Sequence, residues 1–172
     1  MEYYIMELDK RVTNKFIIQK FPGPGSVEYS TAQAKDFREH TGLNTIESDK
    51  SSYPEVLEEP LYMVSKEIRD ILELHDDAII CKEVAMVNLP RKSEKDYAIL
   101  LTDRIDCLHE EAEFYPDKSI KKLVLDRGKI GERRVFKVKG IGPAYIIVSL
   151  DIVESIIRRN CFGVKFTKVE SK

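Results

Sequence analysis

The 172-residue chain lacks long apolar runs, regularly spaced cysteines and any strong net charge, and each absence excludes a class of protein. Apolar stretches such as Tyr97–Leu101 and Ala144–Val148 are far shorter than the roughly 18 to 20 residues that a membrane-spanning helix needs. The three cysteines are odd in number and widely spaced, which argues against a disulfide framework. A net charge of −2 argues against the general basicity of a nucleic-acid-binding protein. We therefore expect neither a membrane nor a nucleic acid as partner.

The first residues make a poor secretory signal, and the sequence lacks the short ligand spacings of metal sites. Its first residues have an acid at position 2 and no basic segment before an apolar one, so we expect a cytoplasmic protein. Cys107 and His109, with His75, Cys81 and Cys161, are ligand types for zinc, but no Cys-x-x-Cys or His-x3-His spacing joins them. A Cys–His nucleophilic pair would need the fold to bring these residues together. We expect buried thiols and surface histidines, with no metal and no other cofactor.

What the sequence does contain is the composition of a folded globular domain, with 42% hydrophobic and 34% charged residues. Its length suits a single domain spanning residues 1–172. Strand-like runs separated by turns follow one another at 2–8, 15–21, 78–89, 96–108, 119–128, 132–140 and 162–169. Strands in series favour an α+β fold, with a mainly antiparallel sheet and two or three amphipathic helices packed on one side.

Two segments near the N-terminus are less regular. Ser30 or Thr31 is a suitable N-cap and Gly42 a suitable stop, so a short helix is predicted over 30–42. The polar, acidic run 43–59 is predicted to be a loop or surface arm.

One pattern occurs twice, at 60–84 and at 144–166, as an aromatic, a short apolar run, Val-Ser, an amphipathic segment and a cysteine-bearing strand. Ser149 lies 84 positions after Ser65, and each hydroxyl is placed to accept a hydrogen bond from an amide of the next helix. Apolar residues at helical spacing follow each serine, at Ile68, Ile71 and Leu72 and at Ile152, Val153, Ile156 and Ile157. We predict a strand–helix–strand duplication within 60–172.

The order of motifs in this region resembles that of a known family. The Val64–Ser65 pair and its helix are followed by "IDCL" at 105–108, "LVLD" at 123–126, "VFKVKG" at 135–140 and "IIVSLDIVESIIRRNCFGVKF" at 146–166. This order resembles the immunity protein 11 family of bacterial polymorphic toxin systems, formerly a domain of unknown function. The resemblance implies a non-catalytic, antitoxin-like protein. Such a protein would bind a cognate toxin and occlude the toxin's active or substrate-binding surface.

Two segments hold candidate partner-binding residues. The run 103–115 contains five acids, Asp103, Asp106, Glu110, Glu111 and Glu113. An acidic face would speed association with a cationic toxin. The alternative is that these acids form a solvated edge after a buried strand and bind no partner. In the arm, Tyr53 and Leu57 are apolar anchors among charged neighbours, as at many interfaces. Packing of the arm against its own domain is the alternative.

Two further functions stay open at this level. A small hydrolase could use a pair of these carboxylates as general acid and base, and a regulatory domain could bind a partner unrelated to toxins. An enzyme needs a concave pocket with converging polar groups, whereas a binding protein needs an exposed complementary surface. We expect a binding protein with no catalytic residue and a toxin as its partner.

Overall fold

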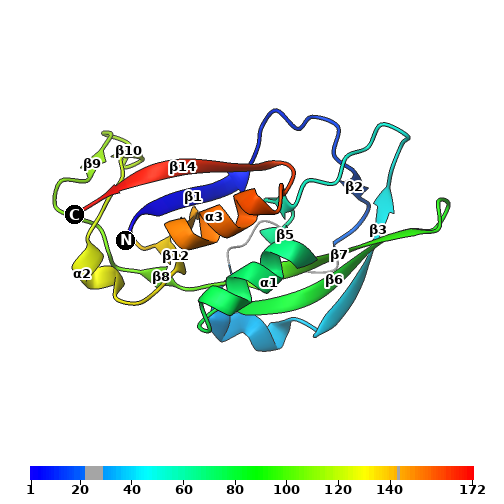
Figure 1. The fold of residues 1–172 in the computed structure, drawn as a ribbon, viewed down its shortest axis with the longest axis horizontal. Helices are drawn as coiled ribbons and strands as arrows, with labels where there is room; N and C mark the ends of the chain where they lie inside the picture. Colours follow the sequence, from blue (N-terminus) through cyan, green and yellow to red (C-terminus); the bar gives the residue numbers. More distant parts are fainter. Residues whose placement is uncertain (22–28, 143) are drawn as a thin grey trace.

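The computed structural model describes residues 1–21, 29–142 and 144–172. In these ranges the strands form two six-stranded sheets and a small hairpin, and two helices lie side by side in front of the sheets (Figure 1). The strand order of sheet A is β2 (Ile17–Ile18), β3 (His40–Ile46), β6 (Ile80–Asn88), β7 (Ser93–Leu101), β5 (Met63–Ser65) and β4 (Val56–Leu57). That of sheet B is β11 (Val124–Leu125), β14 (Val164–Ser171), β1 (Tyr3–Leu8), β13 (Ile146–Ser149), β12 (Val135–Val138) and β8 (Arg104–Ile105).

The remaining elements are short except for two helices. The hairpin consists of β9 (Glu113–Phe114) and β10 (Ile120–Lys122). The helices are η1 (Thr31–Asp36, a 3-10 helix), α1 (Lys66–His75), α2 (Arg127–Ile130) and α3 (Leu150–Arg158). None of the helices in the described ranges is long and apolar enough to cross a membrane.

The predicted α+β class is confirmed, but the expectation of a mainly antiparallel sheet is wrong. Both sheets are mixed, because β3 runs parallel to β6 in sheet A, while β11 and β8 run parallel to β14 and β12 in sheet B. The error came from assuming that consecutive strands pair as hairpins. Several neighbours are instead strands that a helix or a long connection separates in the chain.

The two sheets share one pairing pattern. In sheet A the order β4–β5–β7–β6–β3 has the same sequence of antiparallel and parallel pairs as β12–β13–β1–β14–β11 in sheet B. Within this pattern β1 takes the central place that β7 takes in sheet A. We call sheet A with α1 the first unit and sheet B with α3 the second unit. The five strands of the first unit that share the pattern follow one another in the chain, whereas the second unit takes its central strand from the N-terminus. The two ends of the chain therefore lie together, with Tyr3 opposite Val169 (Figure 1).

Both helices begin at the repeated serines, although the two serines act differently. The Ser65 hydroxyl accepts a hydrogen bond from the amide of Ile68 at 3.3 Å, which confirms the predicted N-cap. Ser149 has the extended backbone of an N-cap, but its hydroxyl donates to the Asp151 carboxylate and accepts no helix amide. The expectation that Ser149 caps α3 through its side chain is therefore wrong, because a carboxylate two residues away is the stronger partner.

A central core joins both helices to both sheets. The two helices bury their apolar stripes in it, through Ile68, Ile71 and Leu72 and through Ile152, Val153 and Ile156. Ile157, which the spacing had placed on the second stripe, is 59% exposed. Val64 and Leu100 of sheet A and Val135 and Val148 of sheet B pack into the same cluster. The two units therefore share one continuous core.

Polar contacts also tie each unit to the other. The Asp76 carboxylate, just after α1, accepts hydrogen bonds from the amides of Arg134 and Val135 at the start of β12, both at 2.8 Å. Just after α3, the Phe162 carbonyl accepts a hydrogen bond from the Glu55 amide at 2.8 Å. The Phe162 amide donates to the Glu55 carboxylate at 3.2 Å. The loop after each helix thus binds the start of a strand of the other unit, β12 in one case and β4 in the other.

The N-terminal segments differ from their predicted form. The helix expected over 30–42 is a 3-10 helix over Thr31–Asp36, and Gly42 lies inside β3 instead of ending a helix. The run 43–59 contains the end of β3 and all of β4. Leu43 and Thr45 are buried while Asn44 and Ile46 are exposed, so this polar stretch alternates as a half-buried strand does.

Candidate functional site

The five acids of the run 103–115 do not form a single acidic face. Asp103 is half-buried and accepts hydrogen bonds from the amide and hydroxyl of Thr31, so it holds η1 in place. Glu111 pairs with Lys172, and Glu113 pairs with Lys121 at 2.6 Å. These lysines lower the pKa of both glutamates. The run is therefore a surface of mixed charge.

Asp106 and Glu110 are the two acids that stay free. Both are exposed, and neither has an ion-pair partner within the described ranges. Exposed charges act on a partner mainly by speeding the encounter, because at the rim of an interface they stay hydrated and gain little from direct contact.

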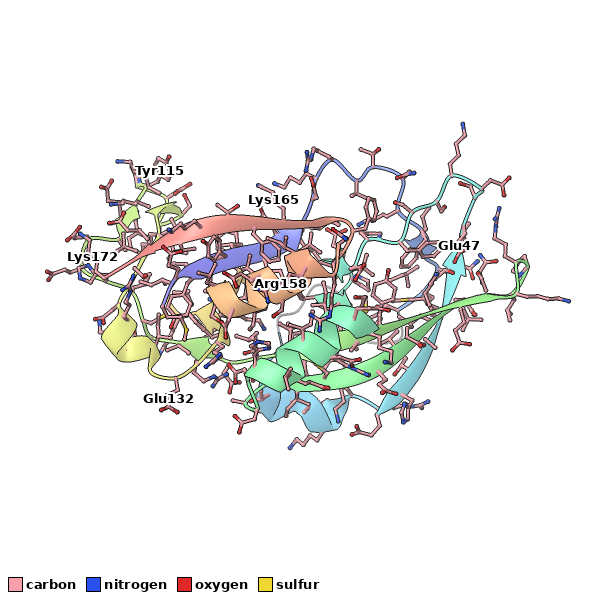
Figure 2. The ribbon with its side chains drawn as sticks, viewed as in Figure 1. Glu47, Tyr115, Glu132, Arg158, Lys165 and Lys172 are labelled. Carbon is pink, nitrogen blue, oxygen red and sulfur yellow. The ribbon has the colours of Figure 1, made fainter. Side chains whose placement is uncertain are left out.

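Two adjacent aromatic residues follow these acids in the chain. Phe114 is 42% exposed and Tyr115 is 51% exposed, at the end of β9 and in the turn that follows. Figure 2 shows Tyr115 at the outer end of the molecule, on a hairpin that projects beside β14 (Figure 1). We call residues 109–122 the β9–β10 hairpin. It carries the two exposed aromatics beside charged residues of the same hairpin, among them Glu113 and Lys121.

The tip of the β9–β10 hairpin is held in one conformation by its own hydrogen bonds. The Tyr115 amide donates to the Ser119 carbonyl and the Lys118 amide donates to the Tyr115 carbonyl, both at 2.9 Å. The Asp117 carboxylate accepts from the amide and hydroxyl of Ser119, which lowers the pKa of Asp117. Pro116 restricts the backbone between them. The backbone that carries the aromatic pair is therefore held by hydrogen bonds within the hairpin.

The base of the hairpin is fixed to the body of the protein. The His109 amide donates to the Val124 carbonyl at 3.0 Å, and Lys122 pairs with Glu170 of β14 at 2.8 Å. The pair of Glu111 and Lys172 adds a third attachment. The hairpin is therefore attached to sheet B at three points.

The candidate residues of the arm pack against their own domain. Tyr53 stacks on Phe16 with ring centroids 5.4 Å apart, donates its hydroxyl to Glu47, and lies 5.1 Å from the ammonium of Lys95. Leu57 is 2% exposed and belongs to a core cluster of sheet A. Leu57 is therefore a core residue, and we exclude it from the candidate surface. Tyr53 is half-buried.

A cleft of about 1100 Å³ lies beside the turn that joins β4 to β5. Its described lining includes Phe16, Phe21 and Tyr62 but none of the five acids of the run 103–115. Two acids that do line it are engaged, since Glu7 pairs with Lys165 and Glu58 accepts the amide of Leu8. The carboxylates considered for a hydrolase therefore do not converge in this cleft.

The three cysteines are free, with Cys107 fully buried and the other two partly buried. Burial raises the pKa of Cys107 to about 11 and those of Cys81 and Cys161 to about 12, so all three are neutral thiols at physiological pH. Among the described residues no cluster of three or more histidines, cysteines and acids is arranged to hold a metal ion.

No family model and no curated protein matches this chain. The resemblance to the immunity protein 11 family thus rests on the order of its motifs. The residues that sequence reasoning missed are Phe114 and Tyr115, which follow the acids directly. The signal in the sequence was two adjacent aromatics directly before Pro116 and Asp117. A Pro-Asp pair is typical of a surface turn, so the residues beside it are not expected to be buried.

Proposed function

We propose that this protein is a non-catalytic immunity protein, which binds and neutralises a bacterial toxin, and that the β9–β10 hairpin is its toxin-binding element. The observation that carries the proposal is the exposed pair Phe114 and Tyr115 on an ordered, projecting hairpin. Aromatic side chains are enriched among the residues that dominate binding energy, especially where charged residues surround them. The family resemblance supports a toxin as the partner.

The geometry of the hairpin suits tight binding. Self-protection requires near-complete occupancy at low concentration, hence a Kd of about 1 nM or below, or about −12 kcal/mol. A pre-ordered tip loses little conformational entropy on binding, so more of the contact energy appears as affinity. Phe114 and Tyr115 would enter a concave part of the toxin surface and block access to its active or substrate-binding surface. Asp106 and Glu110 would speed the encounter with a cationic toxin.

The test uses the product of the gene immediately upstream of this one, which under this proposal should encode the toxin, expressed with and without the immunity protein. The double variant Phe114→Ala with Tyr115→Ala should raise the dissociation rate by roughly 100-fold or more, because buried aromatic anchors set the lifetime of a complex. Phe162→Ala is the matched control, since Phe162 is 50% exposed but lies on the loop after α3. Glu110→Lys should lower the association rate and its dependence on salt.

Two outcomes would decide against parts of the proposal. If the wild-type protein neither binds the upstream toxin nor protects cells from it, the immunity function is wrong. If the wild-type protein protects and the double aromatic variant binds as tightly as Phe162→Ala, the toxin is bound by another surface.

A further inference from the structure

The cleft of about 1100 Å³ beside the β4–β5 turn lies where the two sheets meet. Its lining comes from both units, since Met6 of β1 and Ile146 of β13 belong to sheet B, while Leu57 of β4 and Ile99 of β7 belong to sheet A. The Tyr62 hydroxyl, from the β4–β5 turn, donates to the Met6 carbonyl at 2.7 Å and joins the two sides. A molecule bound in this cleft would therefore contact both units.

Much of the lining is apolar, and it is rich in aromatic rings. Leu61 and Leu101 contribute buried core side chains. Four aromatic residues of the lining are only half-buried, so they are partly open to solvent: Phe21, Tyr29, Tyr62 and Tyr145. Pockets for small ligands are typically lined by aromatic and aliphatic side chains and have volumes of roughly 300 to 1,000 Å³. The cleft therefore has the lining, and more than the space, that a small molecule with an apolar ring needs.

Three lysines of the cleft are available to a ligand. Lys10 and Lys20 are exposed and Lys15 is half-buried, and all three line the cleft. None of them forms an ion pair with another residue in the described part of the chain. Lys137 also belongs to the lining, but its ammonium donates to the Tyr29 carbonyl at 2.8 Å, so we do not count it.

The acids of the described lining do not balance these lysines. Glu7 pairs with a lysine of β14, and Glu58 accepts a hydrogen bond from an amide of β1, so both are already engaged. Glu59, which is exposed, is the third acid. Three available lysines against one glutamate make the cleft attractive to an anion.

We propose that this cleft binds a small aromatic carboxylate. Its ring would lie against the half-buried aromatic side chains and lose contact with water, which supplies most of the affinity. Its carboxylate would be attracted by the lysines, whose charge selects an anion over a neutral molecule of the same shape. Because the lining comes from both units, binding should also raise the melting temperature.

The cleft and the β9–β10 hairpin are separate sites. Neither Phe114 nor Tyr115 belongs to the described lining of the cleft. The inference therefore does not depend on the proposed function, and each can fail without the other.

The probe is 2-naphthoate, and 2-naphthalenemethanol, which has the same rings and no charge, is its neutral counterpart. Titration at low salt, followed by NMR of side-chain methyl groups, should give a Kd of roughly 0.1 to 1 mM for a carboxylate of this size. The alcohol should bind at least about fivefold more weakly. The methyl signals of Ile18 and Leu61, which line the cleft, should shift. Those of Leu74 and Ile157, which are 80% and 59% exposed on α1 and α3, should not.

Charge reversal tests the lysines. Lys10→Glu with Lys15→Glu should raise the Kd of 2-naphthoate by roughly tenfold and leave that of the alcohol within about twofold of wild type. Lys35→Glu with Lys92→Glu is the matched control, because both lysines are exposed and lie outside the described lining. It should change the Kd of 2-naphthoate by less than about threefold. Circular dichroism should show both double variants folded.

Four results would overturn the inference. The first is the absence of any shift at Ile18 and Leu61 at about 5 mM 2-naphthoate. The second is an equal shift at Leu74 and Ile157, which would mean that the probe binds any exposed apolar side chain. The third is an alcohol that binds as tightly as the carboxylate, and the fourth is an equal effect of the two double variants. Either of these last two would show that the cleft does not select an anion.

Discussion

Among the acidic residues in the described ranges, Asp76 should cost the most stability when it is replaced with alanine. The Asp76 side chain is 4% exposed. One of its oxygens accepts from the Ala78 amide at 3.0 Å, and the other accepts from the amides of Arg134 and Val135 at 2.8 Å. Arg133 Nε lies 3.5 Å away, which adds a positive charge beside the carboxylate.

The size of the effect follows from these contacts. A hydrogen bond to a charged group contributes about 1.5 to 3 kcal/mol, so three such bonds set an upper limit of roughly 5 to 9 kcal/mol. Water can reach the partly exposed amides of Ala78 and Arg134, so we expect a net loss of about 3 to 5 kcal/mol. The melting temperature should then fall by roughly 6 to 20 °C for a chain of this length.

Chemical denaturation followed by circular dichroism measures this loss, and the neighbouring Asp77 provides the control. Asp77 is exposed and makes no hydrogen bond or ion pair within the described ranges, so Asp77→Ala should leave the free energy of unfolding within about 0.5 kcal/mol of wild type. Asp76→Asn should fall between the two, because one carboxylate oxygen becomes a donor that faces an amide. A difference below about 1 kcal/mol between Asp76→Ala and Asp77→Ala would refute the role of Asp76 in joining the two units.

Three further predictions concern acid stability, a helix cap and the thiols. Burial alone would raise the pKa of Asp151, but the Ser149 hydroxyl and the charge of Arg134 lower it below its usual value. The resulting stability is present above about pH 4 and is lost as the pH falls through the lowered pKa, so the destabilisation of Asp151→Asn relative to wild type should shrink in acid. Ser65→Ala should lower the free energy of unfolding by about 0.5 to 2 kcal/mol in urea titrations. Native thiols should react slowly with a thiolate-specific reagent at about pH 8, Cys107 slowest of all, and quickly once unfolded.

Each of these has an opposing result. If the free energies of unfolding of Asp151→Asn and wild type differ by the same amount from neutral to acid pH, ionisation of the Asp151 carboxylate does not stabilise the fold. If Ser65→Ala has the same free energy of unfolding as wild type, the 3.3 Å bond of the N-cap does not contribute to stability. Rapid labelling of all three native thiols would contradict their burial.

Local features were predictable from the sequence because local physics decides them. The strand β1 was found from its aromatic and β-branched residues, and the start of α1 from Ser65 and the apolar spacing after it. β3 was missed because "HTGLNTI" contains a glycine and polar residues that are typical of loops. Only its place between β2 and β6 makes it a strand, through burial of Leu43 and Thr45.

The parts of the site that the sequence did not reveal depend on exposure and on distant partners. Nothing local distinguishes Glu111 and Glu113, which pair with lysines of the same chain, from Glu110, which does not. Leu57 looked like an interface anchor because its neighbours are charged, yet both faces of its short strand are buried. Asp76 follows a helix in the way that a solvated acid often does, and its partners are 58 and 59 positions away.

The place of β1 in sheet B has a consequence for how the chain acquires its structure. β1 is synthesised before the other strands, but its neighbours β13 and β14 are the last two strands of the chain. Until they meet, sheet B has a vacant centre bounded by two unpaired strand edges, which are a hazard for aggregation. Closing the longest loop in the molecule should therefore be a late and slow step, whereas the tight turn between β6 and β7 lets sheet A form its central pair early. A permuted chain with β1 moved behind β14 through a short turn would make the same pair local, and should fold faster to the same two sheets.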